Sequence, residues 1–223
     1  MTPNITGRML LLGAICAGIL AFATSGGWAS TALAREHEDE HGREHEHEVL
    51  APASPRGEAP TDSVYQLDAV WTDQDGRSTG FSTLRGKTRV IAMFYSNCQY
   101  VCPLIVDEMK QVERALTPDE RARVEFGLFS FDPERDTPRV LKAYAEKRGL
   151  DETRWRVYTG SPDAVLDLSA VLGMRIRKEP NGEFSHSAII TVLDPDGIIR
   201  YQMLGLGQER APLLAALRAA LKR

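Results

Sequence analysis

The chain has 223 residues, of which 43% are hydrophobic and 26% are charged, and its formal net charge is -4. This length allows one ordinary globular domain with its own core and leaves an excess, which lies at the N-terminus. The negative net charge and the lack of a basic cluster argue against nucleic acid as a partner.

Residues 1–34 are predicted to form a secretory signal peptide. The apolar run from Met9 to Ala23 fits the hydrophobic region of such a signal and is short for a bilayer span. Small residues precede the expected cleavage point after Ala34, so we expect an exported, periplasmic protein. An uncleaved N-terminal membrane anchor is the alternative, and only then would the protein contact a membrane. A lipid anchor on Cys16 is disfavoured because the bulky Ile15 precedes it.

Residues 35–61 are predicted to be a disordered linker ahead of a globular domain at 62–223. The segment Glu36–Glu48 is rich in acidic residues and histidines and has no apolar residue to bury. One interpretation is a solvated tail, and the other is a loose arm that captures metal ions weakly. The histidines of this arm are His37, His41, His45 and His47.

The domain is predicted to begin with a β-hairpin and a buried strand. Val64–Trp71 and Arg77–Thr79 flank the turn residues Asp75 and Gly76, which is typical of a hairpin. The apolar run from Arg89 to Tyr95 then predicts a strand that is buried on both faces.

A helix is predicted directly after this strand, opened by Pro103, and a strand from Val124 to Phe131 follows it. This gives a strand, helix, strand unit. The apolar residues of the helix recur with helical spacing on one face, at Ile105, Val106, Met109, Val112 and Leu116.

The C-terminal half alternates helices with strands. Thr137-Pro138 and Ser161-Pro162 each combine a capping residue with a first-turn proline, which predicts helices that end at Gly149 and Gly173. Further on, two strands at Ala188–Leu193 and Ile198–Met203 are joined by a turn at Asp194–Gly197, and a helix closes the chain at Ala211–Leu221. The order of these elements predicts an α/β fold, a mixed sheet with helices on both faces.

Cys98 and Cys102 are the cysteines that remain once Cys16 leaves with the signal peptide. A disulfide between them would close so small a loop that it adds little stability. In an oxidising compartment such a pair is therefore either a redox-active disulfide or a metal site.

Both thiols are expected to face the positive end of a helix dipole. Pro103 at the first helical position would place Cys102 at the helix cap and Cys98 in the loop before it. The dipole favours thiolate over thiol, and two soft sulfurs suit Cu(I) especially, although zinc accepts them too.

His186, the one histidine of the predicted domain, is expected in a loop at a strand end. A single histidine is by itself usually a surface or core residue without a metal.

Four motifs occur in a fixed order along the domain, together with the landmarks Trp155 and Thr159-Gly160. In this order they resemble the Sco/SenC family of copper-binding, thioredoxin-like respiratory assembly proteins, and the resemblance covers roughly residues 62–206. The motifs are the C-x-x-x-C-P of Cys98–Pro103, the D-P-x-R-D-T-P of Asp132–Pro138, the H-S of His186-Ser187 and the D-P-x-G of Asp194–Gly197.

The resemblance implies a thioredoxin-like mixed sheet flanked by helices, here with an N-terminal β-hairpin extension. It also implies that copper, as Cu(I) or Cu(II), is bound by Cys98, Cys102 and His186. The protein would deliver copper to, or prepare the thiols of, an apo-enzyme with a binuclear copper centre. Cytochrome c oxidase is the usual target of the family, and nitrous oxide reductase is another. Other periplasmic copper carriers and thiol reductants are further expected partners.

The sequence departs from the commonest family pattern between the cysteines. Gln99-Tyr100 stands where Pro-Asp is usual, so copper affinity or partner choice can differ here. The segment Asp132–Pro138 is interpreted as structural, because Asp, Thr and Pro in that order favour a loop and a helix start.

Three alternatives remain. A periplasmic thiol-disulfide oxidoreductase could use the Cys98/Cys102 pair, although general reductases have two residues between their cysteines. A peroxiredoxin-like peroxidase is disfavoured because Tyr95 stands at the position three residues before Cys98, where a threonine is expected. A structural zinc site would need a fourth ligand from the histidine-rich arm or a partner.

Overall fold

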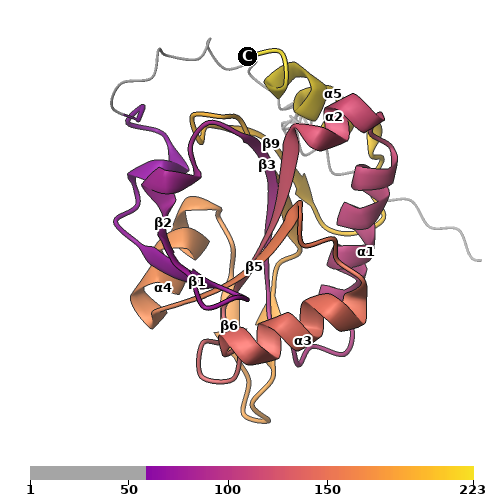
Figure 1. Ribbon diagram of the computed structural model, residues 1–223. Helices are drawn as coiled ribbons and strands as arrows, with labels where there is room; N and C mark the ends of the chain where they lie inside the picture. The colour runs from indigo at the N-terminus through magenta and orange to yellow at the C-terminus, as the bar shows by residue number, and fades with distance from the viewer. Residues whose placement is uncertain (1–58) are drawn as a thin grey trace, which may run out of the picture. The chain divides into compact units, whose positions relative to one another are not determined.

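In the computed structural model, which describes residues 59–223, a seven-stranded mixed sheet lies at the centre (Figure 1). The signal peptide predicted at 1–34 and most of the linker predicted at 35–61 lie outside the described residues, so both stay predictions. No helix within residues 59–223 has the length and apolar character needed to cross a membrane.

The sheet combines parallel and antiparallel strands. The strands of the main sheet are β1 (Val70–Asp73), β2 (Ser78–Gly80), β3 (Thr88–Phe94), β4 (Val124–Ser130), β5 (Trp155–Gly160), β8 (Ile189–Leu193) and β9 (Ile199–Leu204). Their order is β2-β1-β5-β4-β3-β8-β9. β4 pairs parallel with β3 and β5, and the other neighbours pair antiparallel. Two short strands, β6 (Ile176–Lys178) and β7 (Phe184–His186), form a separate antiparallel hairpin.

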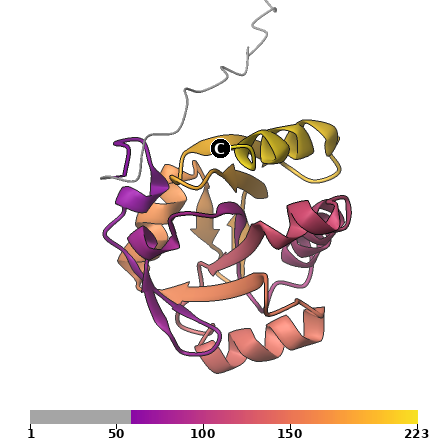
Figure 2. The same cartoon turned by 45° about the horizontal axis from the view of Figure 1, so that its top comes forward.

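Helices cover both faces of the main sheet. They are α1 (Val101–Arg114), α2 (Pro118–Ala122), α3 (Pro138–Arg148), α4 (Pro162–Val171) and α5 (Ala211–Ala220), with short 3-10 helices η1 (Val64–Gln66) and η2 (Phe81–Leu84). Figures 1 and 2 show α1, α3 and α5 on one side of the sheet and α4 on the other. Ion pairs join α1 to α3 through Asp107 and Arg148, and α1 to Arg210 at the start of α5 through Glu108. The predicted thioredoxin-like fold, a mixed sheet flanked by helices, is therefore confirmed.

The central strand β3 carries the chain to the loop that holds the cysteines. All seven of its residues are buried, as the continuous apolar run predicts, and β4 and β8 flank it. Large aromatic side chains fill the core around it, namely Trp71, Phe81, Phe94, Phe126, Phe129 and Trp155. Because β3 is fixed on both edges and both faces, the residues that follow it start from a rigid position.

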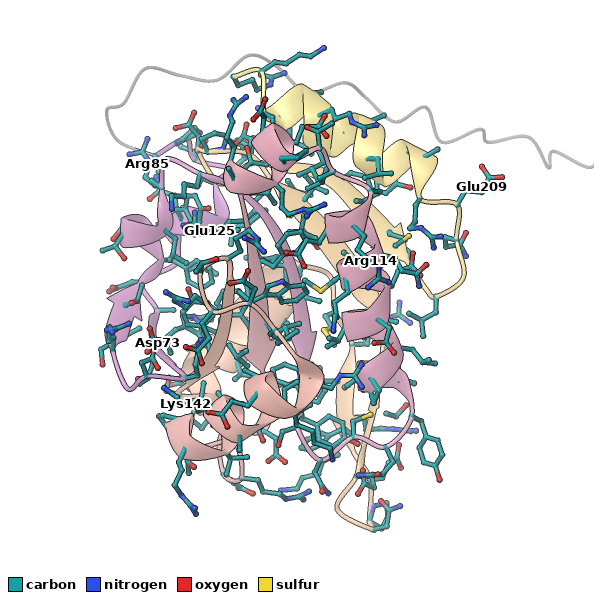
Figure 3. The ribbon with its side chains drawn as sticks, turned by 45° about the vertical axis from the view of Figure 1, so that its right-hand side comes forward. Asp73, Arg85, Arg114, Glu125, Lys142 and Glu209 are labelled. Carbon is teal, nitrogen blue, oxygen red and sulfur yellow. The ribbon has the colours of Figure 1, made fainter. Side chains whose placement is uncertain are left out.

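The predicted N-terminal hairpin is present, but its first strand is shorter than expected. β1 begins at Val70, and the residues from Val64 to Gln66 form η1 instead. The hydroxyl of Ser63 accepts the backbone N–H of Tyr65 (3.0 Å), which favours a helical turn over an extended strand. The hairpin adds to the sheet edge through β5. Nζ of Lys142 in α3 donates to Oδ1 of Asp75 in the turn of this hairpin (2.9 Å). Figure 3 shows Lys142 close to Asp73, which lies at the start of the same turn.

Besides the short 3-10 helix η2, four elements lack a clear signal in the sequence and were not predicted: α2, β5, β6 and β7. The helix α2 is a single turn set by a capping box between Thr117 and Glu120. β5 is only partly buried, and β6 and β7 have three residues each, too few to show a period of two. The other predicted elements occur within a few residues of their expected bounds.

Gly197 and Gly76 offer a matched test of the packing at the N-terminal end of the domain. Both residues have φ of 81°. A Cβ at Gly197 would lie 2.4 Å from the Tyr65 ring, whereas a Cβ at Gly76 would meet nothing within 4 Å. Gly76→Ala should therefore cost only the backbone strain, about 1–2 kcal/mol. Gly197→Ala should lower the free energy of unfolding by about 1–3 kcal/mol more. Urea unfolding of both variants measures the difference, and equal losses would contradict this packing.

Candidate metal centre

The loop between β3 and α1 places Cys98 at the N-terminus of α1. The backbone N–H of Cys98 donates to the carbonyl of Tyr95 (3.3 Å), which turns the chain directly after the strand. The Sγ of Cys98 then accepts the backbone N–H of Cys102 (3.3 Å). This N–H is one of the helix-terminal donors without an intrahelical acceptor, so the sulfur takes the place of a capping oxygen.

The start of α1 differs from the prediction. The helix begins at Val101, and Cys102 lies within its first turn rather than at the cap. Pro103 occupies the third helical position. An N–H at this position would have no acceptor within the helix, so the proline costs no helix hydrogen bond. Tyr100 is the capping residue but offers no side-chain hydrogen bond. The predicted consequence, two sulfurs at the positive end of the helix, nevertheless holds.

Cys102 lies deeper than Cys98. Its side chain has 0% exposure, and its Sγ accepts the backbone N–H of Tyr95 (3.4 Å). Cys98 is 8% exposed, and both cysteines are free thiols. The pair therefore has one sulfur near the surface and one embedded in the core.

His186 completes the group from the other side of the site. It was expected in a loop before β8, but it is the last residue of β7. Its Nδ1 lies 2.9 Å from the backbone carbonyl oxygen of Ser187. Because a carbonyl oxygen only accepts, Nδ1 carries the proton in the neutral ring and Nε2 keeps its lone pair. That Nε2 lies 3.6 Å from the Sγ of Cys102.

The structure thus brings together the three residues that the motifs singled out. One ligand atom each from Cys98, Cys102 and His186 lies within 4.8 Å of the others. Within residues 59–223 this is the one cluster of histidine, cysteine or acidic side chains with that compactness. Two sulfurs and one imidazole nitrogen are donors for a soft or borderline metal ion.

The two thiols differ strongly in acidity. The hydrogen bond from the Cys102 thiol, helped by backbone N–H groups of α1 and by His186, lowers the pKa of Cys98 to about 4. The same hydrogen bond to Cys98, together with burial, raises the pKa of Cys102 well above its usual range. At neutral pH the pair therefore carries one negative charge, on the sulfur nearer the surface, and one proton, on the buried sulfur.

Three aromatic rings lie along one side of the imidazole. The rings of Tyr95 and Phe131 lie 6.1 Å and 5.0 Å from the His186 ring. Phe184 packs against both, at 5.2 Å and 5.3 Å. These rings screen one side of the site from water, which strengthens the electrostatic interactions inside it.

The segment Asp132–Pro138 is structural, as predicted, and it supports the site more directly than expected. The buried carboxylate of Asp136 accepts hydrogen bonds from the backbone N–H and the hydroxyl of Ser96, two residues before Cys98. Thr137 caps α3, and Arg135 donates to the carbonyl of Gly182 (2.6 Å) in the turn between β6 and β7. The segment therefore ties the cysteine loop to the hairpin that carries His186. The roles of Ser96 and Asp136 were missed because no local pattern marks this pairing.

Comparison with known proteins identifies the family. The family model described as SCO1/SenC matches residues 55–222. The chain belongs to the SCO1/SenC family. The resemblance inferred from the ordered motifs is therefore confirmed.

Individual relatives agree with this assignment. The SCO1 protein homolog of Bacillus subtilis (strain 168) is 29% identical over 131 residues, which cover 57% of this chain and 67% of the relative. A SCO1/SenC family lipoprotein from Bacillus anthracis has a crystal structure with 28% identity and a TM-score of 0.62, covering 71% of this chain and 94% of that one. Bradyrhizobium japonicum ScoI, solved with copper bound, has 26% identity and a TM-score of 0.58, covering 68% of this chain and 96% of that one.

The unequal acidity of the two thiols can be tested by alkylation. The Cys98 thiolate should react with iodoacetamide at a rate that changes little between about pH 6 and pH 8, whereas an ordinary thiol would gain about tenfold per pH unit. The buried Cys102 should stay unlabelled. Peptide mass spectrometry follows each site separately. In Cys102→Ala the thiol donor is lost, so the Cys98 rate should become pH-dependent. A tenfold rise per unit at Cys98 in the unmodified chain would contradict the assigned charge.

Proposed function

We propose that this protein is an exported copper carrier that binds a single copper ion through the Sγ atoms of Cys98 and Cys102 and the Nε2 of His186. The observation that carries the proposal is the compactness of these three donor atoms, which lie within 4.8 Å of one another. The hydrogen bond from Nδ1 to Ser187 supports it, because it fixes the tautomer whose Nε2 lone pair points toward the sulfurs. Bradyrhizobium japonicum ScoI, a relative with copper bound, supports the choice of metal.

The donor set suits copper in both oxidation states. Thiolate sulfur is a preferred ligand of Cu(I), and imidazole is a preferred ligand of Cu(II). A structural zinc site is disfavoured because it requires four ligands and this cluster has three. Binding would remove the proton from Cys102, so the affinity for copper should increase with pH.

Delivery would proceed by ligand exchange with thiolates of a target apo-enzyme. Cys98 is the sulfur nearer the surface and carries the negative charge, so an incoming thiolate reaches the metal at this side first. BsSco, a structural neighbour at 23% identity, is a member of the Sco family of cytochrome c oxidase assembly proteins. Together with the family assignment, this suggests a binuclear copper centre of a respiratory enzyme as the target. Cleavage of residues 1–34 would release the carrier into the periplasm, and the histidine-rich arm within 35–61 would capture further copper weakly.

A thiol-disulfide oxidoreductase is the second candidate. The free thiols and the low pKa of Cys98 favour it, because a thiolate near the surface is what attacks a disulfide. Against it stands His186, which supports the low pKa of Cys98 but is not required for disulfide exchange, and whose Nε2 lies 3.6 Å from the sulfur of Cys102. In the copper-carrier proposal all three side chains have a role.

X-ray absorption of the chain loaded with less than one equivalent of Cu(I) tests the ligand set. We expect two sulfur scatterers and one nitrogen around the metal, since the high-affinity site should fill before the arm. Cys98→Ala should lose one sulfur and most of the affinity, whereas Tyr100→Ala, at an exposed side chain beside the site, should retain both. A first shell without sulfur would contradict the proposal.

His186→Ala separates the two candidate functions, because only copper binding needs the imidazole. Loss of an outer ligand-supporting group costs about 10–100-fold in metal affinity, so loss of the ligand itself should cost more than about 100-fold for Cu(II). Assembly of the copper enzyme in cells should fall, while oxidation of the dithiol by a periplasmic oxidant continues. Complementation and a disulfide-reduction assay measure the two effects. Full complementation by His186→Ala, with failure of Cys98→Ser, would instead establish the oxidoreductase.

A further inference from the structure

The hairpin of β6 and β7 carries His186 but is separate from the main sheet. Within the described residues, β6 pairs with β7 alone, and the register places His186 opposite Ile176. The turn is closed by a hydrogen bond from the N–H of Glu179 to the carbonyl of Glu183 (2.8 Å). The position of the imidazole relative to the cysteines therefore depends on the contacts that fasten this hairpin to the rest of the domain.

Besides the contact of His186 with Cys102, three polar contacts fasten the hairpin to the rest of the domain. The hydroxyl of Tyr95 donates to Oε2 of Glu183 (2.5 Å), and Arg135 donates to the carbonyl of Gly182 (2.6 Å). The third is an ion pair between Lys178 and Glu134 (3.0 Å), whose side chains are 51% and 73% exposed. An ion pair this exposed contributes little to holding two segments together.

Tyr95 is the residue that contacts both halves of the site. Its backbone N–H donates to the sulfur of Cys102 (3.4 Å), and its carbonyl accepts the N–H of Cys98 (3.3 Å). Its ring meets the ring of His186 edge-on, at 6.1 Å and 84°. Its hydroxyl holds Glu183, three residues before the histidine. One residue thus joins the two halves, with its backbone bonded to the cysteines and its side chain in contact with the hairpin.

We propose that the hydrogen bond between Tyr95 and Glu183 is a clasp that sets the distance from the Nε2 of His186 to the two sulfurs. Tyr95 and Glu183 are then positioning residues of the copper site, an inference that rests on the proposed function. Without the clasp, the polar contacts left at this end of the hairpin are one bond to a backbone carbonyl and an exposed ion pair, beside the non-directional ring packing of Phe184. Because imidazole is a preferred ligand of Cu(II) while the thiolates alone retain Cu(I), loosening the clasp weakens the hold on Cu(II) selectively.

Tyr95→Phe tests the clasp with the smallest possible change. It removes one oxygen and leaves the ring contacts with Phe131, Phe184 and His186 in place. The readout is the thiolate-to-Cu(II) charge-transfer absorption of the full-length chain and its decay after excess chelator is added. Copper bound by the histidines of the arm gives no such band, so the readout reports the sulfur site alone. We expect the Cu(II) decay to be about tenfold faster. Cu(I) has no such band, so its release is followed with a chromophoric Cu(I) chelator and should change less than about twofold.

Substitutions of Glu183 test the same hydrogen bond from its acceptor side. Glu183→Ala should reproduce the effect of Tyr95→Phe, and the double variant should release Cu(II) no faster than either single one, because both remove the same bond. Glu183→Gln keeps an oxygen that accepts the hydroxyl and should restore near-native decay. Glu134→Gln removes the exposed ion pair from the same hairpin and should leave the decay unchanged.

The outcomes separate the clasp from the proposed function. If the unmodified chain shows no charge-transfer band, the copper site is wrong and the clasp with it. If the band is present but Tyr95→Phe and Glu183→Ala release Cu(II) at the native rate, only the clasp is overturned. Equal acceleration by Glu134→Gln would also overturn it, since any loosening of the hairpin would then suffice. If Tyr95→Phe unfolds the domain, Glu183→Ala, at a half-buried turn residue, decides alone.

Discussion

The contact between the sulfur of Cys98 and the N-terminus of α1 is the interaction on which the site depends. By accepting the N–H of Cys102, the sulfur satisfies a donor at the start of the helix. The hydrogen bond from the Cys102 thiol then places the negative charge on Cys98, and this bond together with burial keeps the proton on Cys102. These two contacts between the cysteines therefore determine which sulfur is charged and which one keeps its proton.

The second constraint on the site is that its two halves lie far apart in the sequence, since His186 follows Cys102 by 84 residues. The cysteines follow a strand buried on both faces, whereas the histidine lies on a hairpin outside the main sheet. Asp136 and Arg135, neighbours in one loop, contact the cysteine loop and the hairpin respectively. The two halves are therefore anchored to a common segment, which explains why a motif far from both in sequence accompanies them.

Local patterns predicted β3 and α1, which hold the cysteines, but neither the hairpin that carries His186 nor the contacts that align the two halves. The apolar run of β3, the prolines at the starts of α3 and α4, and the ordered motifs all reflect short-range chemistry. The pairing of Tyr95 with Glu183 joins residues 88 positions apart and leaves no local signal. The start of α1 was misplaced for a related reason. The N-cap residue Tyr100 offers no side-chain acceptor, and the N–H of Cys102 is accepted instead by the sulfur of Cys98, which the usual preference for Ser, Thr, Asp or Asn does not include.

The unequal burial of the three side chains has a consequence for the exchange of a metal ion. Cys102 is inaccessible, Cys98 is buried but lies nearer the surface, and His186 is half-buried on a separate hairpin. A symmetrical, fully buried site would hold an ion firmly but give a partner no donor to replace. Under the proposed function, an incoming ligand would displace the imidazole or the sulfur of Cys98 while Cys102 still held the ion, so the metal would pass to the partner without release to water. The unequal burial of the three donors, more than their chemical types alone, would then suit a carrier better than a structural metal site.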